Sequence, residues 1–215
     1  IYTGEDTLSL HDALPISTSS GSTAKELIPA GNYIARCYQM IQIGTVPEVI
    51  NNETKLMNKV RIGWELPTET RVFNEEKGEQ PFVISKEYTL SLSDKANLRK
   101  MLASWRGKDF TEDQAKCFDI TILLGLPCML NIIHKASKDG TKTYQEIGAV
   151  SPMPKGVECP KQVHDNTLLE FDNFDWVVFD SLPDFIKDKI KTSAEFKLLP
   201  NPLDTQSTEE DEAPF

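Results

Sequence analysis

Apolar and polar side chains alternate with a period of two in three consecutive segments of the chain. Residues 32–43, 59–66 and 82–92 each repeat an apolar residue at every second position, which is typical of strands that bury one face. We expect the polar residues 47–53 to form the loop between the first two strands. The inward faces are predicted to carry Ala35, Cys37 and Ile41 on the first strand, Val60, Ile62, Trp64 and Leu66 on the second, and Phe82, Ile84, Tyr88, Leu90 and Leu92 on the third.

After the third strand the apolar period changes to that of a helix. Ser93 and Asp94 offer N-cap oxygens, and Gly107 supplies a C-terminal stop. Residues 111–114 have the form of a capping box and predict a second, short helix. The buried stripe of the first helix is expected to consist of Leu98, Met101, Leu102 and Trp105.

Two further strands are predicted at residues 128–135 and 142–150, joined by a turn at Lys138-Asp139-Gly140. The order strand, strand, strand, helix, strand, strand is that of a five-stranded OB-like Greek-key barrel with a helix between strands 3 and 4. Another small antiparallel sheet with one helix is the alternative. The predicted fold class is therefore mainly β, with a C-terminal extension and a disordered acidic tail.

Composition divides the chain into four parts. Residues 1–27 form a leader in which Asp6 to Ile16 resembles a translated sequencing adapter; a signal peptide is the rival interpretation, but a basic n-region is missing. The OB-like domain is expected at 28–156, an extension packed on the barrel at 157–199, and the disordered acidic tail at 200–215.

The net charge of -10 is unevenly distributed. Residues 31–156 carry 17 basic and 15 acidic side chains, whereas residues 157–215 carry 5 basic and 14 acidic ones. The body is therefore near neutral and able to meet a polyanion, and the acidity belongs to the end of the chain.

Several classes of protein are excluded or disfavoured by what the sequence lacks. An apolar run of ~18 residues is absent, so no membrane partner is expected. The four cysteines form no C-x-x-C pair, which indicates a cytoplasmic protein without structural zinc or another cofactor. Nucleophile elbows and phosphate loops are missing as well, so we expect no enzymatic activity.

The chain ends in an acidic run followed by Pro-Phe, which closely resembles the tail tip of bacterial single-stranded DNA-binding proteins. An aromatic residue and a terminal carboxylate on a flexible tether suit a basic-rimmed apolar pocket of a partner. The resemblance implies recruitment of replication or recombination proteins; a solubilising tail is the alternative. The partner-binding residues would be Glu209, Glu210, Asp211, Glu212, Pro214 and Phe215.

A second resemblance covers the body, from Gly31 to Lys155. Residues 59–62, 88–92, 104–107 and 125–127 resemble the corresponding blocks of a family of bacteriophage single-stranded DNA-binding proteins. The resemblance implies an OB-type binder that acts in viral replication or recombination in the host cytoplasm. A homo-oligomer is compatible with it.

Single strands are held by aromatic faces and by cations along the backbone, and the predicted sheet offers both. Trp64, Tyr88 and Trp105 fall on apolar faces and are expected in the core, and Lys95, Arg99 and Lys100 are expected on a solvated helix face. We therefore expect non-specific coating of single-stranded DNA, with an OB-like protein-interaction module as the alternative. The candidate nucleic-acid-binding residues are Arg36, Tyr38, Lys59 and Arg61 on the outer face, Lys86 at a suspected bulge, and Lys135 and Tyr144 beyond them.

Overall fold

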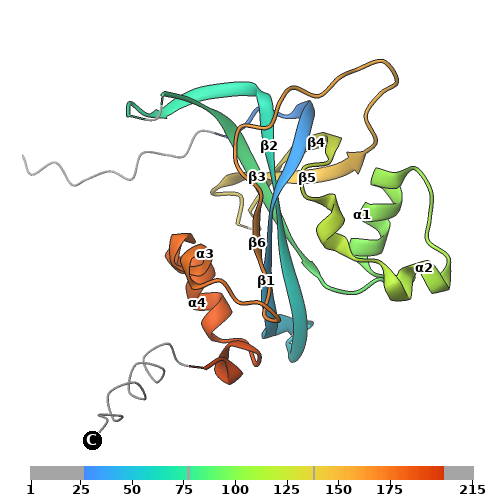
Figure 1. Ribbon diagram of the computed structural model, residues 1–215, viewed down its shortest axis with the longest axis vertical. Helices are drawn as coiled ribbons and strands as arrows, with labels where there is room; N and C mark the ends of the chain where they lie inside the picture. The colour runs from blue at the N-terminus through green and yellow to red at the C-terminus, as the bar shows by residue number, and fades with distance from the viewer. Residues whose placement is uncertain (1–26, 77, 138, 201–215) are drawn as a thin grey trace, which may run out of the picture.

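The computed structural model describes residues 27–76, 78–137 and 139–200 (Figure 1). The prediction of a mainly β fold is confirmed, because a curled antiparallel sheet forms a half-barrel accompanied by a few short helices. The elements are β1 (Gly31–Ile50), β2 (Glu53–Asn74), β3 (Gly78–Thr89), α1 (Asn97–Arg106), α2 (Glu112–Cys117), the 3₁₀ helix η1 (Ile120–Leu123), β4 (Pro127–Ala136), β5 (Thr143–Ser151), β6 (Thr167–Leu169), α3 (Trp176–Ser181), α4 (Asp184–Lys191) and the 3₁₀ helix η2 (Phe196–Leu198).

The sheet follows the order β3-β2-β1-β4-β5, and all of these neighbours are antiparallel. The short strand β6 pairs in parallel with residues 39–41 of β1, on the edge that β4 leaves after pairing with residues 31–36. In Figure 1 the long β1–β2 ribbon runs down the middle of the molecule, with α1 and α2 on one side and α3 and α4 on the other.

The predicted loop at 47–53 is wrong, because both long strands continue through most of it. Pro47 pairs with Leu56, and only Asn51 and Asn52 remain outside the ladder. These two residues have φ values of 52° and 65°. Asparagine tolerates this left-handed region, and a two-residue turn with positive φ matches the twist of a hairpin. A polar stretch that reads as a loop therefore forms the tip of a long hairpin.

A β-bulge in β1 changes which face its side chains occupy. The register with β2 shifts between Cys37 and Gln39, so the alternation before and after this point differs by one residue. Met40 consequently packs in the same core as Cys37, whereas Ile41 packs in the core on the opposite side of the sheet. The prediction that Ile41 shares the inward face of Ala35 and Cys37 is wrong for this reason.

The inner core lies within the curl of the sheet, and α1 covers it. The Trp105 indole N–H donates to the carbonyl of Pro127 at 3.0 Å, and its ring lies 6.1 Å from that of Trp64. Trp64, Tyr88 and Trp105 are all buried, as predicted. Gly107 ends α1 with φ of 71°, and the capping box of α2 is present, also as predicted. The N-cap prediction is wrong, because Ala96 holds that position.

A second core lies on the outer face of the lower β1–β2 hairpin. Ile41 and Ile43 pack there against Leu169 of β6, Phe179 of α3 and Ile190 of α4. The closest approach is at Gly44, whose φ is +87°. A Cβ at this position would lie 2.8 Å from side-chain atoms of Phe171, Ser193 and Glu195, so only glycine fits. The Glu195 carboxylate accepts hydrogen bonds from the backbone N–H and hydroxyl of Thr45, at 2.6 and 2.7 Å.

Residues 152–166, here called the strap, connect β5 to β6 (Figure 1). The strap has no helix or strand of its own, and it crosses back over the outer face of the upper β1–β2 hairpin. The sheet is therefore covered on its outer side twice, by the strap above and by α3 and α4 below.

Candidate nucleic-acid interface

Arg36, one of the predicted contacts, serves the strap. Its guanidinium donates to the carbonyl of Gly125 at 2.6 Å and to the carbonyls of Pro160 and Cys159 at 3.0 and 3.4 Å. These acceptors saturate much of the fork of donors that a phosphate would need. The structure thus gives Arg36 a structural set of partners.

Tyr38 lies under the same strap. Its ring centroid is 5.0 Å from that of His164, and burial raises the pKa of the Tyr38 hydroxyl. Because one side of the Tyr38 ring lies against His164, that side is not open to a base. The sequence had predicted an exposed ring on which a base could stack.

The residue that organises this region, Glu65, was not singled out from the sequence. Its side chain is 0% exposed. Its two carboxylate oxygens accept the backbone N–H groups of Val163 and His164, both at 2.9 Å, and the Nδ1 of His164 lies 2.8 Å away. A glutamate between Trp64 and Leu66 in a strand was the available signal, because a carboxylate is buried only when it is hydrogen-bonded.

Lys59 and Arg61 lie below the strap, in a network of ion pairs on the outer face. Arg61 is 3.6 Å from Glu87 and its guanidinium carbon lies 5.7 Å from the exposed ring of Phe185, while Lys59 is 3.8 Å from Glu48. Lys189 of α4 joins both carboxylates, at 2.9 Å from Glu48 and 2.7 Å from Glu87. The predicted outer face is therefore partly neutralised by its own acidic residues.

Lys86 lies where the two edge strands of the half-barrel meet. Its ammonium group donates to the Glu146 carboxylate at 2.9 Å and to the carbonyl of Ile147 at 2.8 Å, and it lies 6.0 Å from the centre of the Tyr88 ring. Lys86 thereby bridges β3 to β5. The suspected bulge at Lys86 is absent, because β3 keeps a regular register with β2 from the pair Lys59–Thr89 to the pair Leu66–Phe82.

A groove of about 750 Å³ opens beside this bridge, between β3, α1 and β5. Its apolar part includes Met57, Tyr88 and Met101. Among the described residues Glu87 is the one carboxylate that lines it, and Glu87 is already paired with Arg61 and Lys189. Four lysines line the groove, Lys59, Lys86, Lys95 and Lys100; because Glu48 and Glu146 pair with the first two, its net positive charge comes mainly from Lys95 and Lys100.

The N-terminal end of α1 adds to this positive potential. The N-cap residue Ala96 provides no side-chain acceptor, and the first turn contains no acidic residue. Ala96 and Asn97 line the groove, so the partial positive charge of the helix end faces the same space as the lysines. Lys95 and Lys100 are both exposed and have no ion-pair partner in the part of the chain described. The predicted solvated helix face is exposed at these two lysines, but the prediction is wrong for Arg99, which is buried and paired with Asp94, Asp109 and Glu112.

Lys135 and Tyr144 are directly opposite each other on β4 and β5, and both are exposed. The ammonium group of Lys135 lies 2.6 Å from Glu146, whose other carboxylate oxygen is bound by Lys86. Hydrogen bonds from Lys135 and Lys86 lower the pKa of Glu146. Glu146 therefore joins the predicted pair to the groove, while it neutralises both lysines that it contacts.

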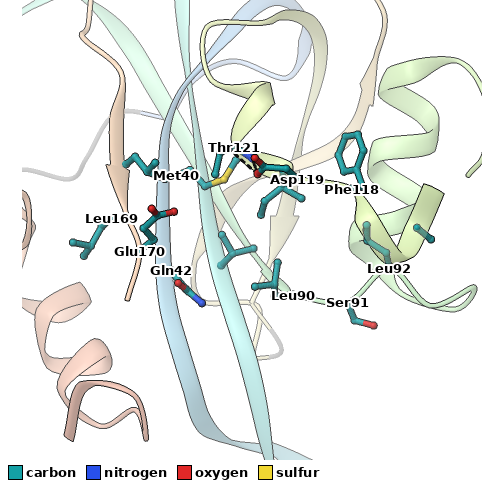
Figure 2. Close-up of a pocket in the computed structure, with 14 residues that line it drawn as sticks. Met40, Gln42, Leu90, Ser91, Leu92, Phe118, Asp119, Thr121, Leu169 and Glu170 are labelled. Carbon is teal, nitrogen blue, oxygen red and sulfur yellow. Dashed lines mark hydrogen bonds between the residues drawn. The ribbon is translucent and has the colours of Figure 1, made fainter. Parts of the chain in front are cut away.

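On the other side of the segment that links β3 to α1 lies a separate, mostly apolar pocket of about 390 Å³ (Figure 2). Met40 and Gln42 of β1, Leu90 and Leu92 of the linking segment, Phe118 and Thr121 after α2, and Glu170 after β6 contribute to its walls.

The predicted partner-binding residues Glu209 to Glu212, Pro214 and Phe215 lie outside the described residues. Within the described ranges, no group of three or more His, Cys, Asp or Glu side chains is arranged to hold a metal ion. No described helix has the length and apolar character needed to cross a membrane.

Comparison of the chain with protein-family models, with curated proteins and with solved structures finds no match.

Proposed function

We propose that the protein binds single-stranded DNA through the groove between β3, α1 and β5. The observation that carries this proposal is the convergence on one groove of four lysines, two of them without a carboxylate partner among the described residues, together with an uncapped helix end. Cations that follow a backbone and apolar or aromatic surfaces beside them are the two features that hold a single strand without regard to sequence.

We further propose that the half-barrel is an OB-type fold. Three observations support this: the path β3-β2-β1-β4-β5, the approach of the edge strands β3 and β5 at Lys86, and the position of α1 between β3 and β4 in the chain. OB-type barrels bind oligonucleotides without catalysis, which agrees with the absence of a nucleophile motif in the sequence.

The acidic C-terminal residues extend the proposal to partners. A polyanionic run followed by Phe215 can dock on replication or recombination proteins and recruit them to coated DNA. This combination of DNA binding and partner recruitment fits a bacteriophage single-stranded DNA-binding protein, the family that the body of the chain resembles.

The test is fluorescence anisotropy of a labelled dT oligonucleotide titrated with the full chain. Intrinsic tryptophan fluorescence is a poor reporter, because Trp64 and Trp105 are buried and Trp176 packs against the second core, away from the groove. We expect binding at low salt, with log K falling against log salt at a slope of about -1.4 from Lys95 and Lys100, and of about -3 if phosphates also displace Glu48 and Glu146 from Lys59 and Lys86. A duplex of equal length should bind more weakly.

The double variant Lys95→Ala/Lys100→Ala sharpens the test, since both side chains are exposed and their loss should leave the fold intact. The salt slope should shrink by about 1.4. Lys191→Ala is the matched control, because Lys191 is exposed on α4, on the opposite side of the sheet (Figure 1). Undetectable dT binding at low salt, or equal effects of both variants, would reject the proposal in favour of a protein-interaction module.

A further inference from the structure

The apolar pocket shown in Figure 2 shares a wall with the lysine groove. The segment between β3 and α1 forms this wall: Leu90 and Leu92 line the pocket, Ser93 lines the groove, and Ser91 borders both. The groove and the pocket are therefore neighbouring cavities separated by this single segment of the chain.

The lining of the pocket suits a small, partly apolar group. Met40, Leu92 and Phe118 supply apolar walls, and a few polar groups stand among them. A volume of about 390 Å³ is within the range of pockets that bind small molecules. The amide oxygen of Gln42 accepts the N–H of Phe171 at 3.1 Å, which fixes the orientation of its amide group.

Glu170 is the polar group that can read such a ligand. It lies directly after β6, and Figure 2 shows it on the wall of the pocket between Met40 and Gln42. No ion pair or hydrogen bond of its carboxylate occurs with other described residues, whereas the second carboxylate of the pocket, Asp119, accepts from the N–H and hydroxyl of Thr121. A carboxylate is an acceptor only, so its ligand has to donate.

We propose that one base of the bound strand turns out of the groove into this pocket and donates its exocyclic amino group to Glu170. The inference rests on the proposed single-strand binding, because the lysine groove supplies the neighbouring phosphates. Cytosine, adenine and guanine carry an amino group, and thymine does not. The protein should therefore discriminate against thymine at one position of its binding site, although the rest of the contact is indifferent to sequence.

The experiment compares dC and dT oligonucleotides of equal length, because the two bases are of similar size and differ at the amino group. Anisotropy titrations of the full chain should show dC binding about fivefold to tenfold more tightly than dT. Glu170→Gln should abolish this difference, because an amide donates to thymine O4 as readily as it accepts from cytosine. Ala115→Phe, which fills the pocket from α2, should abolish it as well.

Asp172→Asn is the matched control. It removes the same charge two residues away, at an exposed position that does not line the pocket, and it should keep the preference for dC. Equal binding of dC and dT by the unmodified protein, or a preference that survives Glu170→Gln, overturns the base pocket while leaving the proposed function intact. Failure of both oligonucleotides to bind rejects the proposed function and the pocket with it. A change in oligomeric state in Ala115→Phe without a change in base preference would assign the pocket to a second copy of the chain.

Discussion

Arg36 and Glu65 are directly opposite each other in the β1–β2 ladder and hold the same strap by complementary backbone groups. The guanidinium of Arg36 donates to the carbonyls of Cys159 and Pro160, and the carboxylate of Glu65 accepts the N–H groups of Val163 and His164. A segment without secondary structure thus obtains on the sheet the hydrogen bonds that a strand partner would have supplied.

The first prediction follows from this pair. Glu65→Gln should lower the free energy of unfolding by about 2–3 kcal/mol, because the amide NH2 cannot accept the backbone N–H group that the second carboxylate oxygen accepts in the parent. Urea denaturation measures the effect, and Glu53→Gln, at an exposed position of β2, is the control. Arg36→Ala should likewise destabilise the fold and leave the dT affinity of the folded protein unchanged. A loss of affinity at full stability would show that Arg36 contacts DNA after all.

The second prediction concerns Glu146, whose carboxylate lies between the ammonium groups of Lys86 and Lys135. Glu146→Gln should strengthen dT binding and steepen its salt dependence, because two ammonium groups lose their internal counter-charge. Salt-dependent anisotropy titrations measure both quantities. Glu112→Gln, which faces Arg99 away from the groove lining, should alter neither. Weaker binding in Glu146→Gln would mean that the bridge between β3 and β5 matters more than the charge.

The third prediction is a pH dependence of stability at the β4–β5 hairpin. Hydrogen bonds from Ser137 and Thr141 lower the pKa of Asp139 to about 2. A carboxyl group whose pKa is lower in the folded state stabilises the fold above its unfolded pKa of about 4, and this contribution is lost as the pH falls towards 2. Asp139→Asn should therefore be less stable than the parent at pH 6, and the difference should narrow between pH 4 and 2. Thermal unfolding across this range tests it, and a constant difference would contradict the assignment.

The fourth prediction concerns the acidic end of the chain. Removal of residues 206–215 should raise dT affinity modestly at low salt, because we expect the polyanionic run Glu209 to Glu212 to compete with phosphates for the basic groove. The gain should fade as salt screens the charges over a Debye length of ~8 Å at physiological ionic strength. Deletion of Phe215 alone keeps the acidic residues, so it should leave DNA binding unchanged and abolish capture of replication proteins from a host lysate. If this variant captures replication proteins as well as the parent does, the tail does not dock through Phe215 and serves only to keep the protein in solution.

Local patterns in the sequence predicted most of the elements because these depend on neighbours in the chain. The alternation around Trp64 placed it in the core correctly, and the capping box at Thr111 predicted α2. The bulge after Cys37 could not be predicted in this way, because apolar and polar residues continue to alternate in the sequence beyond it. The face of Ile41 was therefore predicted wrongly.

The candidate site was harder to predict, because it depends on segments that are distant in sequence. Arg36 and Tyr38 do lie on the outer face, but only the path of the strap, more than 100 residues later, decides that they are covered. Lys95 and Lys100 became groove residues through the approach of α1 to β5, which a helical wheel does not contain. Lys59 and Lys86 were singled out from the sequence and do line the groove.

The bulge in β1 has a consequence for how the chain can come apart. Before it, the strand contributes Ala35 and Cys37 to the core inside the curl; beyond it, the same strand contributes Ile41 and Ile43 to the core beneath α3 and α4. One continuous backbone thus belongs to two apolar interiors on opposite sides of the sheet. The C-terminal helices cannot detach as an independent lobe without uncovering isoleucines of the central strand. Because both interiors share this strand, the half-barrel and its C-terminal helices should melt in a single cooperative transition. Removal of the chain from β6 onwards would expose these isoleucines and make that face a site for self-association.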